Sequence, residues 1–349
     1  ADIVDSSSFD WHVGHTSVPI RVAAGSDPGD PKSEQNRNWQ TRHRNALRAL
    51  NQSLRHETDF WISNTHLLEK FDFRAQVLRE LVRFFRGEPT KINLSIVYQP
   101  IVQVTKGKTI AGAEVLLRAK LYDDTPVAPN ILVDICEANG LGKKFGEWLF
   151  QKIGNEASQL FSVLRFQGFL SINLNPSIID GALPALLKET IVAAGVEPKH
   201  ICLEITEDNA ALDFDKTIPV IEQCRAMGAT IALDDFGTGY SSLEYLQQLR
   251  LDKLKVDRSF VNDIETSPSR SQFLKGILDI AHQMGVDTVV EGIENQQQWT
   301  IVAEYGATLI QGYYAHKPMD LADFLSLLVD QLIKTEKPLI TSNIKTFAR

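Results

Sequence analysis

A (β/α) barrel is the fold class that the sequence predicts, and three observations support it. Beyond residue 90, short runs rich in β-branched and aromatic residues alternate with longer amphipathic stretches. Eight such runs occur over about 245 residues, which matches the strand number and the usual size of this barrel. Polar residues cluster where the runs end, and a parallel barrel collects its strand ends on one face.

The predicted strands are short, and helical stretches separate most of them. In chain order they cover residues 94–102, 110–118, 169–174, 201–206, 230–233, 253–256, 288–291 and 309–311. An open doubly wound sheet is the alternative fold for such a pattern. It is less favoured because no Gly-rich dinucleotide fingerprint follows the early strands. The glycines of Gly237-Thr238-Gly239 follow two aspartates, which would repel a pyrophosphate unless a metal intervened.

The residues before the barrel are predicted to form loops and linker helices. The first forty are dense in turn formers, with one short strand expected near residues 18–23. Apolar residues recur at helical spacing over residues 39–51 and 74–85, and Gly87-Glu88-Pro89 ends the second helix. We therefore expect an N-terminal linker or regulatory segment, a barrel and a C-terminal tail. Their boundaries are residues 1–90, 91–335 and 336–349.

The net charge of -8 limits the partners of the chain. Residues 1–90 hold 12 basic and 12 acidic side chains, so the whole acidic excess belongs to residues 91–349. Affinity for duplex nucleic acid comes from basic side chains that neutralise phosphates, so a duplex partner is not expected. If the acidic part binds a phosphate, bound metal cations would have to reverse the local field.

Cysteine usage and hydropathy bear on the compartment. Cys136, Cys202 and Cys224 are odd in number, widely spaced and set among apolar residues, which predicts buried thiols and a reducing compartment. No apolar run approaches the roughly 18 to 20 residues that cross a bilayer. We expect a cytoplasmic chain without membrane contact of its own. Because it begins at Ala1, it is alternatively the cytoplasmic part of a longer, membrane-anchored protein.

Oxygen-bearing side chains and two cations stand where the predicted strands end. They are Glu114, Arg118, Asn173, Glu204, Asp234, Asp235, Lys255, Glu291 and Gln311. The acids and amides form a hard ligand set without histidine, which suits Mg²⁺ or Mn²⁺ rather than zinc or copper. Two adjacent aspartates allow one carboxylate to bridge two ions while its neighbour holds the second, as two-metal phosphoester hydrolysis requires.

Each of these residues also has a structural explanation when taken singly. An Asp-Asp pair at a strand end often caps a turn or a helix. Lys255 points away from its apolar neighbours Leu254 and Val256, toward either the barrel interior or the outer helices. Inside a barrel it would need carboxylates around it. The recurrence of such residues at the same end of successive strands favours a common site.

An ordered series of motifs between residues 94 and 332 resembles the EAL domain family. The motifs are Tyr98-Gln99-Pro100-Ile101, Glu114-Val115-Leu116-Leu117-Arg118, Asn173-Leu174-Asn175, Leu203-Glu204-Ile205-Thr206-Glu207, Leu233-Asp234-Asp235-Phe236-Gly237-Thr238-Gly239-Tyr240-Ser241-Ser242, Leu254-Lys255-Val256-Asp257-Arg258-Ser259-Phe260, Glu291-Gly292-Ile293-Glu294 and Gln311-Gly312-Tyr313-Tyr314. The chain departs from the usual pattern at Val115 and Val290, where the family has alanine. Every ligand position is intact.

The resemblance implies a TIM-like barrel whose first strand runs antiparallel to the rest. It implies hydrolysis of cyclic-di-GMP to linear pGpG with two Mg²⁺ or Mn²⁺ ions, in bacterial signalling that regulates biofilm formation and motility. It also implies a homodimer formed through the barrel. Residues 1–90 would then be a linker, or the tail of a degenerate sensor or GGDEF domain, although no GGDEF signature is found there.

Carried over position by position, the resemblance implies a metal site. The first metal would be bound by Glu114, Asn173, Glu204 and Asp234. Asp234 would bridge to a second metal that Asp235 also holds. Glu207 would brace the loop over residues 234–242, so that the bridging carboxylate stays in place.

The resemblance also implies residues that act on water and on substrate. Those at the attacking water would be Lys255, Glu291 and Gln311. Lys255 would hold or polarise the water, Glu291 would be a ligand through water or the general base, and Gln311 would complete the network. Gln99 and Arg118 would contact the dinucleotide, Arg118 through a phosphate oxygen. Glu294 would support the site without taking part in catalysis.

Two other functions remain open on sequence alone. A catalytically silent cyclic-di-GMP receptor could use the same pocket to control a partner protein, but the intact acidic set argues against it. A different barrel phosphodiesterase, acting on glycerol phosphodiesters, would be expected to carry histidines at strand ends. Five of the eight histidines instead lie before residue 90 and fit no ligand motif, namely His12, His15, His43, His56 and His66.

Overall fold

The computed structural model describes the backbone of residues 8–13, 16–21, 24–26, 60–62, 65–105, 107–179, 181–206, 214–237 and 249–346. The chain divides into two compact units, Ala1–Glu80 and Leu81–Arg349. The predicted helix over residues 39–51 and the predicted role of Glu207 lie outside the described residues.

In the part of the first unit that the structure describes, four short strands precede a long helix. β1 (Ser8–Val13) pairs antiparallel with β2 (Thr16–Arg21), and β3 (Ala24–Ser26) pairs in parallel with β4 (Phe60–Ile62). Only β2 overlaps a strand expected from the sequence. Helix α2 (Thr65–Phe85) includes the predicted helix over residues 74–85 but begins nine residues earlier.

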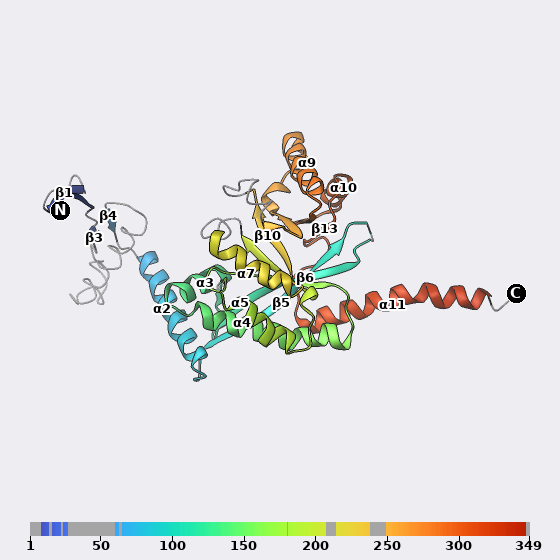
Figure 1. Ribbon diagram of the computed structural model, residues 1–349, viewed down its shortest axis with the longest axis horizontal. Coiled ribbons are helices and arrows are strands. Elements are labelled where there is room, and N and C mark those ends of the chain that lie inside the picture. The colour runs from blue at the N-terminus through green and yellow to red at the C-terminus, as the bar shows by residue number, and fades with distance from the viewer. Residues whose placement is uncertain are drawn as a thin grey trace. The chain divides into compact units, whose positions relative to one another are not determined.

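The second unit is a closed barrel of eight strands, as predicted (Figure 1). The strands are β5 (Ile92–Gln103), β6 (Ile110–Leu121), β8 (Phe169–Asn173), β9 (Ile201–Thr206), β10 (Thr230–Phe236), β11 (Lys253–Val256), β12 (Asp287–Val290) and β13 (Leu309–Ile310). β5 pairs antiparallel with both β6 and β13, which closes the ring, and the pairs from β6 through β8 to β13 are parallel. The antiparallel first strand is therefore confirmed.

Helices surround this barrel, and Figure 1 shows α3, α4 and α5 on one side of the strands with α9 and α10 on another. The helices are α3 (Pro129–Ala138), α4 (Gly142–Ser158), α5 (Leu183–Leu187), α7 (Phe214–Ala226), α9 (Pro268–Gln283), α10 (Gln296–Glu304) and α11 (Leu321–Thr346). The side chain of Asn295 caps α10 by accepting a hydrogen bond from Gln298 N at 2.9 Å. Among the described residues, no helix has both the length and the apolarity to cross a membrane.

One further strand extends the barrel sheet beyond the ring. β7 (Pro126–Val127) pairs antiparallel with the end of β6, and no strand was predicted there. Its shortness and its proline gave too weak a pattern to predict it.

Side chains at every second position of a strand share a face, and this alternation sorts the barrel interior into layers. Along β5, Gln99 lies at one end of the interior, Ile101 in the middle and Gln103 at the other end. The middle layer is apolar, since Ile101 packs with Val289 and Leu309. It separates a charged cluster at the carboxyl ends of the parallel strands from a cavity at their amino ends.

Candidate functional site

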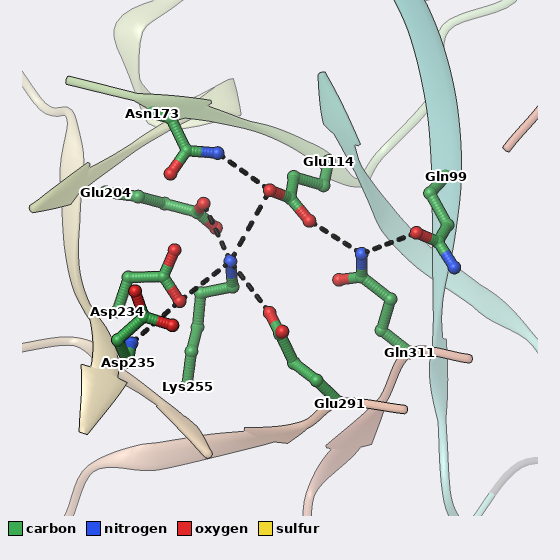
Figure 2. Close-up of polar contacts among 9 residues, drawn as sticks. All are labelled: Gln99, Glu114, Asn173, Glu204, Asp234, Asp235, Lys255, Glu291 and Gln311. Carbon is green, nitrogen blue, oxygen red and sulfur yellow. Dashed lines mark hydrogen bonds and ion pairs between the residues drawn. The ribbon is translucent and has the colours of Figure 1, made fainter. Parts of the chain in front are cut away.

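The ammonium group of Lys255 lies at the centre of the charged cluster, facing four carboxylates (Figure 2). Its Nζ is 2.8 Å from Glu291 Oε1, 2.9 Å from Glu204 Oε2, 3.1 Å from Asp234 Oδ1 and 3.6 Å from Glu114 Oε1. Both Lys255 and Glu204 are only 1% exposed. The cluster carries three more formal negative charges than positive ones when all its groups are ionised, so it is built to attract further cations.

Strand topology accounts for this convergence. Glu114, Glu204 and Asp234 lie on β6, β9 and β10, and Glu291 follows β12 directly. Because these strands are parallel, their carboxyl ends open on one face of the barrel. Lys255 lies on β11, and its side chain points into the barrel between these carboxylates. Of the two directions that the sequence allowed, the interior is therefore the one adopted.

An irregularity in β10 places the two adjacent aspartates. In a regular strand, Asp234 and Asp235 would point to opposite faces. The register between β10 and β11 shifts between Leu233 and Phe236, and Asp235 adopts a positive φ of 57°. Asp235 N donates to Asp234 Oδ1 at 3.0 Å. The bulge therefore keeps both aspartates at the mouth of the barrel, where Figure 2 shows them together.

Two amide side chains hold Glu114. Asn173 Nδ2 donates to Glu114 Oε1 at 2.7 Å, and Gln311 Nε2 donates to Glu114 Oε2 at 2.6 Å. Gln311 Nε2 also donates to Gln99 Oε1 at 3.1 Å. Gln99 Nε2 in turn lies 3.5 Å from the carbonyl oxygen of His316. A chain of hydrogen bonds thus connects this carboxylate to β5 and to the segment after β13.

Burial and mutual repulsion raise the pKa of several acids in the cluster. Burial, then Coulombic repulsion from Glu114 and Asp234, raises the pKa of Glu204 well above its ordinary value. Burial also raises the pKa of Asp235, with repulsion from Asp234 adding to it. The pKa of Glu291 is raised to about 7, again chiefly by burial. Burial and the neighbouring carboxylates thus both disfavour the ionised acids, and a bound cation would oppose both effects.

Lys255 shows the complementary effect. Burial alone would lower the pKa of a lysine, but the carboxylates of Glu204 and Glu114, followed by those of Glu291 and Asp234, raise the pKa of Lys255 well above its ordinary value. Lys255 therefore stays an ammonium over the whole physiological range. It can donate hydrogen bonds and supply positive charge, but it cannot act as a general base.

The donor set fits a hard divalent cation. Glu114, Glu204 and Asp234 offer carboxylate oxygens that all lie within 4.8 Å of one another. Glu204 Oε1 is buried and has no hydrogen-bond partner within the described part of the chain, so an acceptor is left for a cation. Oxygen ligands without histidine are those that Mg²⁺ and Mn²⁺ prefer.

Of the two predicted substrate residues, Gln99 joins the hydrogen bonds of the cluster, whereas Arg118 lies farther away. Arg118 stands four residues beyond Glu114 on the same face of β6, roughly 13 Å along the strand. Its Nη1 donates to the carbonyl oxygen of Leu117, and no ion pair of its guanidinium is found among the described residues. The side chain of Glu294 is exposed, and only its backbone N–H has a described contact, with Gln298 Oε1 at 2.8 Å.

Two polar groups near the cluster in sequence or in contact with it had no predicted role. The buried Oδ1 of Asn175 lacks a hydrogen-bond partner among the described residues. Its position two residues after Asn173 is a signal that could have drawn attention to it. The carbonyl oxygen of His316 contacts Gln99, but a backbone atom leaves no trace in the sequence.

The chain is similar to known proteins. It is 31% identical over 283 residues to the cyclic di-GMP phosphodiesterase NbdA of Pseudomonas aeruginosa, covering 80% of this chain and 35% of the relative. It is 30% identical over 258 residues to the bifunctional diguanylate cyclase/cyclic di-GMP phosphodiesterase MucR of the same organism, covering 72% and 37%. The chain spans about a third of the length of the curated relatives it matches.

A solved structure shares the fold. The PaMucR phosphodiesterase, solved as a c-di-GMP complex, superposes with a TM-score of 0.65 at 28% sequence identity, covering 71% of this chain and 99% of that chain. The sequence profile of the EAL domain matches residues 83–318, which is most of the chain and contains every described residue of the charged cluster. The chain therefore belongs to the EAL domain family.

Proposed function

We propose that this chain hydrolyses cyclic-di-GMP to linear pGpG with two divalent metal ions. The observation that carries the proposal is the buried cluster of four carboxylates around Lys255 at the carboxyl mouth of the barrel. The names of relatives in the same family support the substrate. The acidic surplus supports the metals, because a phosphodiester is an anion that this cluster would otherwise repel.

Three of the residues that would hold the metals, Glu114, Glu204 and Asp234, have carboxylate oxygens within 4.8 Å of one another. Glu114, Asn173, Glu204 and Asp234 would bind one ion, and Asp234 with Asp235 a second. When bound, such ions neutralise the phosphodiester, lower the pKa of bound water and stabilise the leaving oxygen. The hydrogen bonds from Asn173 and Gln311 to Glu114 keep that carboxylate aimed at the site before any ligand arrives.

Lys255 and Glu291 would divide the handling of water. The raised pKa of Lys255 keeps it a donor that orients the attacking water and stabilises charge on the phosphoryl oxygens. Glu291, whose Oε1 lies 2.8 Å from Lys255 Nζ, would take the proton of that water. The water oxygen forms a bond to phosphorus, the bond between phosphorus and the ribose O3′ breaks, and O3′ gains a proton.

Arg118 would recognise the substrate. Its guanidinium lies toward the open end of β6, beyond the metal ligands, and no carboxylate within the described residues pairs with it. A phosphate oxygen of the dinucleotide matches its forked donors. Gln99 would contribute on the other side, although its amide is already held by Gln311 and His316.

The test is chromatography of cyclic-di-GMP after incubation with the full chain and Mg²⁺ or Mn²⁺. We expect metal-dependent formation of pGpG, its loss in Glu114→Gln, and its retention in Glu304→Gln, which alters an exposed acid at the end of α10. Intact nucleotide that still binds by calorimetry would replace this proposal with the receptor function.

The remaining predictions about assembly and context belong with this proposal. The homodimer through the barrel, the cytoplasmic location and the part boundaries at residues 90/91 and 335/336 follow from the resemblance and the sequence pattern. Sedimentation of the full chain at micromolar concentration tests the dimer, and a monomer alone would contradict it.

A further inference from the structure

A large cavity lies at the amino-terminal end of the barrel, away from the charged cluster. Its volume is about 610 Å³, within the range of small-molecule sites. Its wall includes Gln103, Phe169, Thr230, Lys253, Asp287 and Leu332. These residues come from five strands of the barrel and from α11, and the segment of residues 164–168 before β8 completes the wall.

The cavity is separate from the site proposed above. The apolar layer of Ile101, Val289 and Leu309 lies between them, with Ala111 and Phe169 packed against it. On β11 the side chains of Lys253 and Lys255 share a face, yet Lys253 lines the cavity and Lys255 lies in the cluster. A ligand of the cavity would therefore not compete for the metal ligands.

Lys253 is the unusual feature of this cavity. It is only 8% exposed, and its Nζ lies 4.3 Å from the centroid of the Phe169 ring. Within the described part of the chain, Lys253 has no ion pair and no side-chain hydrogen bond; Asp287, its register partner on β12, is exposed and forms no ion pair with it. A cation–π contact stabilises a lysine by only about 0.5–2 kcal/mol, which is small beside the cost of burying an unpaired charge.

The rest of the wall indicates what would complement this ammonium. Apolar side chains line much of it, Leu309, Leu328 and Leu332 among them. Gln103 Oε1 is buried there without a hydrogen-bond partner among the described residues, so a polar acceptor also faces inward. Exposed Arg165 adds a second positive charge, whereas Lys199 is already paired with Glu197 at 2.9 Å.

We propose that this cavity is a second ligand site, which binds an organic anion with an apolar body and places the anionic head on Lys253. The apolar body would lie against the leucines and Phe169. A carboxylate or a phosphate monoester offers the same complement to the ammonium.

The test is calorimetric titration of the full chain with sodium octanoate, octyl phosphate and 1-octanol. We expect at least one of the two anions to bind. Lys253→Met should weaken that anion about 10-fold or more, since a charge-assisted hydrogen bond is lost, while 1-octanol changes less than about threefold. Comparing octanoate with octyl phosphate identifies the preferred head group.

Two further variants keep the test decisive. Lys275→Met removes a lysine of α9 that pairs with Asp279 away from the cavity, and it should leave anion binding unchanged. Leu332→Glu places a carboxylate on a half-exposed wall residue, so it should weaken the anion if Lys253→Met fails to fold. Absence of anion binding to the unaltered chain, or equal losses for octanoate and 1-octanol, would overturn the proposal.

Discussion

Lys255 and Lys253 stand two residues apart on β11, face the same interior and are both almost completely buried. Lys255 is surrounded by four carboxylates at the carboxyl end of the barrel, whereas Lys253 contacts an aromatic ring at the amino end. Lys255 belongs to a network with an excess of negative charge, whereas Lys253 has no anionic partner among the described residues. The comparison teaches that burial alone does not define a site; the charge left uncompensated shows which ligand is missing.

The largest expected effect follows from removing each lysine in turn. Lys255→Met should reduce phosphodiesterase activity by roughly 10²–10⁴-fold, because both the positioning of water and the stabilising charge are lost. In the metal-free protein at pH 8 it should also lower the free energy of unfolding by about 3–5 kcal/mol, since buried carboxylates lose their cation. Lys253→Met should leave stability unchanged or raise it, because it removes a buried charge that pairs with no carboxylate among the described residues.

Urea unfolding of both variants with EDTA present checks this contrast. If Lys255→Met and Lys253→Met lower the free energy of unfolding equally, the carboxylates around Lys255 do not stabilise it more than the surroundings of Lys253 do. Repeating the unfolding with Mn²⁺ should recover part of the loss in Lys255→Met, because added cations compensate the same carboxylates.

The second largest expected effect is the stabilisation of the protein by a divalent metal ion, which should depend on the carboxyl end of the barrel and not on the amino end. A divalent ion at a thousandfold excess over its dissociation constant raises the free energy of unfolding by about 4 kcal/mol. We expect Mg²⁺ or Mn²⁺ to raise the Tm of the unaltered chain and of Lys253→Met equally, and to leave Glu114→Gln nearly unchanged. Thermal unfolding with and without EDTA measures this, and an undiminished metal effect in Glu114→Gln would remove Glu114 from the ligand set.

Much of the barrel could be predicted because its information is local. Each of the eight strands from β5 to β13 that close the ring overlaps a predicted run, since short β-branched segments between helices specify a strand without knowledge of its neighbours. The short strands β1, β3, β4 and β7 were not predicted. Such strands depend on pairing partners rather than on their own pattern.

The sequence predicted which residues form the site but not their geometry, and most of these residues were identified from the family motifs. The convergence of Glu114, Glu204 and Asp234 within 4.8 Å agrees with that set, but the bulge at Asp235 has no signature in the sequence. The cavity around Lys253 could not be foreseen at all. It exists because residues from distant strands meet when the ring closes, and no single segment records that contact.

The pH dependence of stability gives a third test of the difference between the two ends of the barrel. The pKa of Glu291 in the folded protein, about 7, lies above the ordinary value of a glutamic acid. Folding therefore favours the protonated form. Its contribution to stability is present at pH 4 and lost as the pH rises through about 7.

Without metal, the unaltered chain should lose up to about 3 kcal/mol of unfolding free energy between pH 5 and pH 8 through this group. Glu291→Gln should lose less over the same range, whereas the exposed control Glu304→Gln should follow the unaltered chain. Unfolding curves at several pH values in EDTA measure the difference, and identical slopes for Glu291→Gln and the unaltered chain would contradict the assignment.

The smallest expected effect compares two glutamines on the same face of β5. Gln99 accepts a hydrogen bond from Gln311 at the carboxyl mouth, so Gln99→Leu should cost about 1–2 kcal/mol, much of it from the donor left unpaired on Gln311. Gln103 Oε1 is buried at the other end without a partner within the described residues, so Gln103→Leu should be neutral or stabilising by up to about 1 kcal/mol. Urea unfolding of the two variants measures the difference. A destabilising Gln103→Leu would mean that this oxygen already has a partner, such as an ordered water, and that the amino end is better satisfied than its protein contacts indicate.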